Sequence, residues 1–144
     1  MTSQGATDLS ELLRSTSPVL HTGTFVFGHI PARTDADSRN VLKLLADLPI
    51  QSLFREDEGW IVIVEQSVAD QVQLQSTFPC KRITLKVQSS LEAVGFMAAI
   101  TARLTELRIG VNPVSGYFHD HLFVPEDKAE AAMEMLKRMA TEAS

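Results

Sequence analysis

The chain has 144 residues, of which 44% are hydrophobic, so it can bury a core and is expected to be globular rather than disordered. Its formal net charge of -5 and its dispersed basic residues argue against nucleic-acid binding, which needs clustered lysine and arginine. A single cysteine excludes an internal disulfide, and no apolar run approaches the roughly 20 residues of a membrane span, so a cytoplasmic protein without membrane or nucleic-acid partners is expected.

The first half of the chain predicts helices and strands in a regular order. A short helix is expected where Asp8 and Glu11 form a capping-box-like start, and Asp35 to Arg39 is expected to be a polar turn. A hairpin is expected around Gly59, because glycine can take the positive φ that closes such loops. The predicted elements are a helix at 8–14, a strand at 22–30, a helix at 40–48, strands at 50–55 and 60–65, and a helix at 67–75.

The second half repeats this order. Apolar and polar residues alternate from Ile83 to Gln88, as in a half-buried strand. Ser89 and Glu92 have the spacing of a capping box, so a helix is predicted from there to Leu107. Strands are predicted at 109–115 and 118–124, followed by a helix after residue 125. Each half therefore reads strand, helix, strand, strand, helix, with the joint near residues 77–80.

This order, with these residues, resembles the ACT domain, a regulatory module that senses small molecules. Ile109-Gly110-Val111-Asn112 is similar to the start of the second strand of ACT domains, and Gly116 to Pro125 resembles a segment of small bacterial tandem ACT proteins. The resemblance implies an α+β fold of two ferredoxin-like, ACT-like βαββα units, with antiparallel sheets and helices packed on one face. It places an N-terminal segment at 1–17, a first ACT-like domain at 18–79 and a second ACT domain at 80–144.

The resemblance also implies a ligand site between two modules or subunits. ACT domains commonly bind an effector at the loop before the first helix and at the start of the second strand. Free amides and the positive dipole end of a helix attract a carboxylate, and an asparagine offers both donors and acceptors to an amino acid. The bland alternative is that these residues only cap a helix and form a turn. The positions concerned are Ser89, Ser90, Leu91, Glu92, Ala93, Val94 and Gly95, with Val111, Asn112 and Pro113.

Two histidines near the end of the second half form another candidate. On a strand, His119 and His121 project to the same face, in a column with Tyr117 and Phe123. We interpret Tyr117, His119 and His121 as contacts with an interface or a ligand. Two histidines at this spacing can also bind a transition metal, but the sequence names no convincing third and fourth ligand, so no metal site is predicted.

No enzyme motif occurs in the chain, which lacks the nucleophile elbow, the phosphate-binding loop, the zinc-protease motif and the dinucleotide fingerprint. The sequence therefore predicts a regulatory protein without catalytic residues or cofactor, which binds a small molecule such as an amino acid. A homodimer that acts through a separate effector protein is expected. The alternatives are an oligomerisation or protein-interaction module without a ligand, and a metal-binding enzyme centred on His119 and His121.

Overall fold

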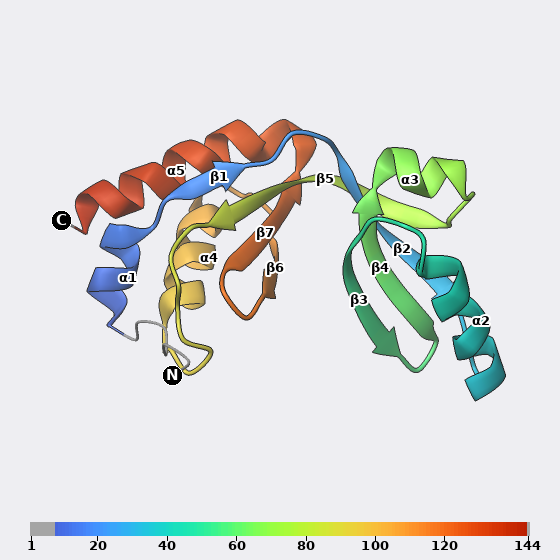
Figure 1. Ribbon diagram of the computed structural model, residues 1–144. Helices are drawn as coiled ribbons and strands as arrows, with labels where there is room; N and C mark the ends of the chain where they lie inside the picture. The colour runs from blue at the N-terminus through green and yellow to red at the C-terminus, as the bar shows by residue number, and fades with distance from the viewer. Residues whose placement is uncertain (1–7, 144) are drawn as a thin grey trace. The chain divides into compact units, whose positions relative to one another are not determined.

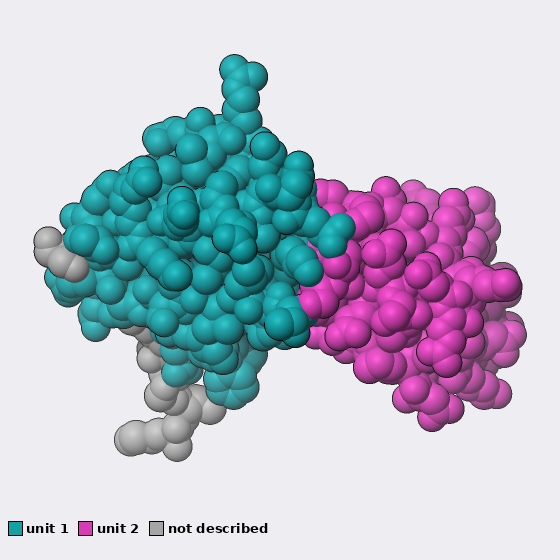
Figure 2. Space-filling view, turned by 90° about the horizontal axis from the view of Figure 1, so that it is seen from above, with its two compact units in different colours: residues 1–22, 81–144 teal, residues 23–80 magenta. Residues whose placement is uncertain are grey.

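The computed structural model describes residues 8–143, which form two compact units (Figure 2). Within that range, unit 1 comprises residues 8–22 and 81–143, and unit 2 comprises residues 23–80. The domain boundaries predicted at residues 18 and 80 stay a prediction. The units differ from them because residues 18–20 pair with the end of a later strand and so belong to unit 1. Residues 1–7 of the predicted N-terminal segment lie outside the described residues.

Unit 2 is an antiparallel sheet covered by two helices. Its strands follow the order β3-β4-β2-β5. The first residues of β5 belong to this unit, and its last residues belong to unit 1. Buried side chains from β2, α2, β4 and α3 form one hydrophobic cluster, which places both helices on one face of the sheet. The elements are β2 (Phe25–Pro31), α2 (Asp35–Leu45), β3 (Ile50–Glu56), β4 (Gly59–Glu65), α3 (Gln66–Gln71) and β5 (Ser76–Leu85).

Helix α2 begins earlier than the sequence predicts. Asp35 to Arg39 is not a turn, because Thr34 and Asp37 form a complete capping box: the Asp37 amide donates to Thr34 Oγ1 at 3.1 Å, and Asp37 Oδ2 accepts from the Thr34 amide at 3.2 Å. Polar residues can therefore form the exposed first turns of this helix. The hairpin prediction is confirmed, with Glu56 opposite Gly59 in the β3–β4 ladder.

Unit 1 contains the remaining elements (Figure 1). In its sheet, β1 pairs with β5, β5 lies beside β7, and β7 pairs with β6. Strand β1 was not predicted, because three residues are too few to show an alternating pattern. The elements are α1 (Leu9–Ser15), β1 (Pro18–Leu20), the end of β5, α4 (Phe96–Glu106), β6 (Asn112–Ser115), β7 (Asp120–Pro125), a 3₁₀ turn (Glu126–Lys128) and α5 (Ala129–Glu142).

The core of unit 1 lies on one face of its sheet. Ile83 and Leu85 of β5 and Leu122 and Val124 of β7 are fully buried against α1, α4 and α5. Because side chains alternate along a strand, the residues between them project to the opposite face. The predicted α+β architecture of two ferredoxin-like units with helices on one face is confirmed. Among residues 8–143, no helix has the length and apolar character that a membrane span requires.

Candidate functional site

Helix α4 begins later than the sequence predicts. The expected capping box of Ser89 and Glu92 is absent, since α4 starts at Phe96, after Gly95 at φ 90°, and no side chain caps it. The prediction was wrong because the Ser89 hydroxyl bonds to a residue far along the chain, while the Glu92 amide donates to Ser90 Oγ at 3.1 Å in a local turn. The first amides of α4 therefore lack both an intrahelical acceptor and a side-chain cap, and carry the positive end of the helix dipole.

A buried carboxylate belongs to the same region. Asp120, the first residue of β7, is only 6% exposed, and its Oδ2 accepts a 2.8 Å hydrogen bond from the Ser89 hydroxyl. By strand alternation Asp120 shares the core face with Leu122, whereas His121 lies on the opposite face. A charge on the core face costs desolvation energy unless hydrogen bonds or an opposite charge compensate it.

A cavity of about 110 Å³ joins these two features. Three parts of unit 1 line it: the loop after β5, the first turn of α4, and the adjoining ends of β6 and β7. The lining thus combines hydroxyls, a carboxylate, a helix start and apolar side chains. The loop contributes Ser89, Ser90, Leu91 and Ala93, the helix contributes Phe96 and Met97, and the strands contribute Ser115 and Asp120.

The remaining predicted ligand residues do not line this cavity. Glu92, Val94 and Gly95 belong to the same loop, and Gly95 acts on the site through the backbone turn that starts α4. Asn112 and Pro113 lie at the other end of β6, where Asn112 pairs with Phe123 rather than with the residues at the cavity. Val111 precedes β6 and is half-buried against the core.

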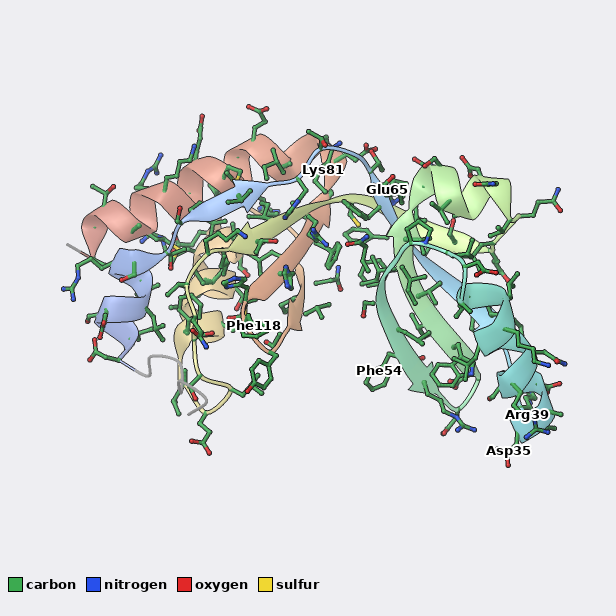
Figure 3. All side chains as sticks on the ribbon, in the orientation of Figure 1. Asp35, Arg39, Phe54, Glu65, Lys81 and Phe118 are labelled. Carbon is green, nitrogen blue, oxygen red and sulfur yellow. The ribbon has the colours of Figure 1, made fainter. Side chains whose placement is uncertain are left out.

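The surface next to the cavity is unusually apolar. Leu91 and Val94 in the loop are 71% and 85% exposed. Tyr117 and Phe118, in the turn between β6 and β7, are 64% and 62% exposed, and Figure 3 shows Phe118 at this turn. Their rings contact each other edge to face, with centroids 4.9 Å apart. Tyr117 therefore does not continue the column predicted with the histidines, because β7 begins only at Asp120.

His119 precedes β7 and His121 lies within it, so the two histidines are not on one strand as predicted, and their environments differ. His119 Nδ1 is buried and makes no hydrogen bond within the described residues. His121 Nδ1 lies 2.9 Å from Thr84 Oγ1, and the same hydroxyl lies 2.8 Å from His21 Nε2. In residues 8–143, no group of three or more histidine, cysteine, aspartate or glutamate side chains could hold a metal ion.

The electrostatics of the two hydrogen-bonded histidines are similar. Partial burial, and after it the nearby Arg82 guanidinium, lowers the pKa of His121 and the pKa of His21 below the ordinary value. Both causes disfavour a charged imidazole. Both rings therefore favour the neutral form more than a free imidazole does.

Sequence reasoning missed Asp120 and Ser115 as cavity residues. The signal was present in β7, where alternation places Asp120 on the same face as Leu122 and Val124, and an acid on a core face is rare enough to need an explanation. The contribution of Phe96 and Met97 could not be foreseen, because it depends on the late start of α4.

Comparison with known proteins identifies the family of the chain. Two family profiles, each described as ACT domain, match residues 4–81 and 77–138. A Vibrio cholerae protein described as of unknown function and as a possible transport protein is 37% identical, over 92% of this chain and 95% of its own, with a TM-score of 0.77. No curated protein sequence matches the chain.

More distant structures share the fold alone. A protein from Agrobacterium tumefaciens is 16% identical over 87% of this chain and 89% of its own, with a TM-score of 0.65. The regulatory subunit of aspartate kinase from Thermus thermophilus is 10% identical over 87% of this chain and 97% of its own, with a TM-score of 0.68. With both halves matched by family profiles and a relative of 37% identity along nearly its whole length, the chain belongs to the ACT domain family.

Proposed function

We propose that this protein is a regulatory ACT protein that binds a small amino acid, or a similar zwitterion, in the unit 1 cavity without transforming it. The observation that carries the proposal is that one cavity combines the buried carboxylate of Asp120 with the uncapped start of α4 at Phe96. The ligand ammonium would pair with Asp120, and the ligand carboxylate would accept from the first amides of the helix. Each end of the zwitterion thus has a complementary group.

The charge of Asp120 supports a cationic group in the ligand. Ser89 supplies one neutral hydrogen bond to this carboxylate, and an ammonium would add the opposite charge that a buried carboxylate needs. A volume of about 110 Å³ is small beside the roughly 300–1,000 Å³ of sites for drug-sized ligands, which favours a ligand with a short side chain.

Family membership supports a regulatory, ligand-binding role in general. The aspartate kinase neighbour is itself a regulatory subunit, and it aligns along 97% of its length, so a chain of this size can be a regulatory protein that acts on a separate effector protein. A cytoplasmic location, as the single cysteine suggests, is part of the proposal.

A homodimer is also part of the proposal. Leu91, Val94, Tyr117 and Phe118 expose apolar surface beside the cavity, and a second subunit would remove it from water. The same surface favours a second candidate, an oligomerisation module without a ligand. In that case Asp120 would serve only to hold Ser89 in place.

Calorimetric titration and thermal shift with the twenty amino acids test the proposal. A ligand at a hundred times its dissociation constant stabilises a protein by about 2.7 kcal/mol, so one or more small amino acids should raise the melting temperature clearly. Asp120→Asn keeps the shape of the side chain but removes its charge, and we expect it to weaken binding at least about tenfold, or 1.4 kcal/mol.

The matched control is Asp57→Asn, which removes the same charge from an exposed hairpin in unit 2 and should leave binding unchanged. Equal weakening by the two variants would contradict the role of Asp120. If no amino acid stabilises the wild-type chain while sedimentation shows a dimer, the oligomerisation module is the better description.

A further inference from the structure

The carboxylate of Asp120 has fewer partners than its burial requires. Asp120 is only 6% exposed, and its Oδ2 accepts one hydrogen bond, from the Ser89 hydroxyl at 2.8 Å. Within residues 8–143 the carboxylate forms no ion pair and accepts no second hydrogen bond. A buried charge is costly unless an opposite charge or several hydrogen bonds compensate it. The carboxylate therefore gains from a cation in the cavity that it lines.

Nearby positive groups do not supply this compensation. The residues that line the unit 1 cavity include no lysine, arginine or histidine. His121 follows Asp120 on the opposite face of β7, and burial, then the Arg82 guanidinium, lowers the pKa of His121, which favours its neutral form. The start of α4 carries the equivalent of about half an elementary charge, less than the full charge of the carboxylate. The Asp120 end of the cavity is therefore negative.

Serine hydroxyls accompany the carboxylate in this cavity. Ser115 pairs directly with Asp120 across β6 and β7, so both side chains project to the same face of the sheet. Ser89 and Ser90 line the cavity from the loop after β5, and Ser90 Oγ accepts from the Glu92 amide at 3.1 Å. Each hydroxyl oxygen has two lone pairs. The side-chain donors at this end are therefore all oxygens: one carboxylate and three hydroxyls.

This set of donors selects the class of cation. Carboxylate and other oxygen ligands suit hard cations, whereas thiolate and imidazole suit transition metals. Calcium takes about six to eight oxygens, commonly from several carboxylates, and no second acid lines the cavity. One carboxylate balances one positive charge. A volume of about 110 Å³ holds an ion and water molecules beside it, because one water needs roughly 10–15 Å³.

We propose that a monovalent alkali cation, sodium or potassium, binds at the Asp120 end of the unit 1 cavity, between the carboxylate and the serine hydroxyls. This site goes beyond the proposed function, because the cation binds without an amino acid. The cation and the ammonium group of an amino acid would use the same carboxylate, so they compete. Only this competition rests on the proposed function.

Sodium-23 magnetic resonance of the full chain tests the site. Sodium that exchanges between water and a protein site relaxes faster, so the protein should broaden the sodium signal. We expect the excess line width to saturate as sodium chloride replaces choline chloride at constant ionic strength. Potassium chloride should displace the bound sodium, and the concentration it needs shows which of the two ions binds more tightly.

Variants locate the bound sodium. Asp120→Asn removes the charge and should weaken sodium binding at least about tenfold. Ser115→Ala keeps both the charge and the bond from Ser89, and should weaken sodium binding about threefold, as expected for one lost hydroxyl ligand. Asp57→Asn removes the same charge from an exposed hairpin in unit 2 and should change nothing.

The competition has its own measurement. Calorimetric titration with an amino acid that stabilises the chain should give a higher apparent dissociation constant in sodium or potassium chloride than in choline chloride. Sodium binding without binding of any amino acid would contradict the proposed function alone. Amino-acid binding without saturable sodium broadening would contradict the cation site alone.

Three further outcomes would overturn the cation site. Broadening that Asp57→Asn reduces as much as Asp120→Asn would mean general attraction of sodium to an acidic protein. Unchanged broadening in both Asp120→Asn and Ser115→Ala would place the sodium outside the cavity. Displacement of sodium by magnesium at concentrations where potassium has no effect would mean that the site takes a divalent ion.

Discussion

In each unit a short segment joins a strand to the helix that follows it, β2 to α2 in unit 2 and β5 to α4 in unit 1. The two helices start in different ways. In unit 2, residues 32–34 join β2 to α2, and Thr34 and Asp37 cap the helix completely. In unit 1, residues 86–95 join β5 to α4, and no side chain caps that helix. A helix start offers free amides and a positive dipole end. Side chains satisfy this end in unit 2, whereas no side chain caps it in unit 1.

The cavities beside the two connections differ in how exposed their charged side chains are. The unit 2 cavity is larger, about 360 Å³, but it is lined mainly by exposed charged side chains of both signs: Arg33, Arg55, Glu56 and Asp57. The unit 1 cavity is about 110 Å³ and contains a carboxylate that is only 6% exposed. An exposed ion pair contributes only about 0–1 kcal/mol, whereas a buried charge needs a compensating partner. The proposed ligand site is therefore in the smaller of these two cavities.

The largest expected effect concerns Gly59, a hairpin residue whose backbone packs against residues 30–32 at the connection in unit 2. In unit 2, a Cβ at Gly59 would lie 2.3 Å from the Ile30 carbonyl oxygen and 2.8 Å from the Ala32 amide nitrogen, so the hairpin tip is packed on the connection. Gly59→Ala should therefore destabilise unit 2 by more than about 2 kcal/mol. Urea unfolding followed by the fluorescence of Trp60, the single tryptophan, reports on this unit.

Gly95 in unit 1 should be less sensitive. Its φ of 90° costs a residue with a side chain about 1–2 kcal/mol, but the nearest atom to an added Cβ is Leu9 Cδ2 at 3.7 Å, an ordinary contact. Gly110→Ala, with nothing within 4 Å, is the control and should be neutral. A larger destabilisation by Gly95→Ala than by Gly59→Ala would contradict the view that the connection in unit 2 is the more tightly packed of the two.

Helix capping should distinguish the two units, because the loss of an N-cap lowers the free energy of unfolding by about 1 kcal/mol. Thr34→Ala removes a true cap, so it should lower the free energy of unfolding by about 1 kcal/mol and reduce the helical circular dichroism as α2 frays. Ser89→Ala should leave the helical signal unchanged, because Ser89 caps no helix and bonds to Asp120 instead. A loss of helix in Ser89→Ala would mean that this hydroxyl does act at the start of α4.

His21 and His121, which both contact the Thr84 hydroxyl, give unit 1 a pH dependence that can be assigned. The pKa of His21 and the pKa of His121 are lowered in the folded protein, first by burial and then by Arg82, while the unfolded chain keeps the ordinary value near 6.5. Below that value the unfolded state binds more protons, so the free energy of unfolding should fall as the pH is lowered.

Urea unfolding between pH 8 and 5.5 measures this effect. The window lies above the region where Asp37 and Glu142 titrate, since the pKa of each carboxyl is lowered: by the Arg33 amide, then Thr34, for Asp37, and by a hydrogen bond from Arg103 for Glu142. His21→Gln with His121→Gln should flatten the dependence. A slope equal to that of the wild type would show that these two rings are not its source.

The smallest expected effect concerns ion pairs. In unit 1, Arg103 Nη1 lies 2.6 Å from Glu142 Oε2 and joins α4 to α5, whereas in unit 2 Arg55 Nη2 lies 3.8 Å from Asp35 Oδ1 with both side chains largely in solvent. Arg103→Ala should lower the melting temperature slightly, and less so at high salt, while Asp35→Asn should not change it. The reverse order would contradict the ranking by geometry.

The sequence by itself determined the order of the elements other than β1, and the features that depend on near neighbours. The β3–β4 hairpin around Gly59 and the N-cap of α1, where Asp8 Oδ1 accepts from the Glu11 amide at 2.8 Å, were both foreseen. Alternation, helical spacing and caps act between residues at most about four positions apart, so a single sequence displays them.

Only the tertiary structure decided which residues of the candidate site lie together. Ser89 has the spacing of a cap but bonds to Asp120, 31 positions away, and the His21 contact with Thr84 spans 63 positions. The Ser89 hydroxyl could cap a helix, but in the fold it donates to the buried carboxylate of Asp120. A buried charge is costly without hydrogen bonds, which favours this distant partner. The bond from Ser89 to Asp120 and the contacts of His21 and His121 with Thr84 all depend on strand pairing, which local sequence pattern does not reveal.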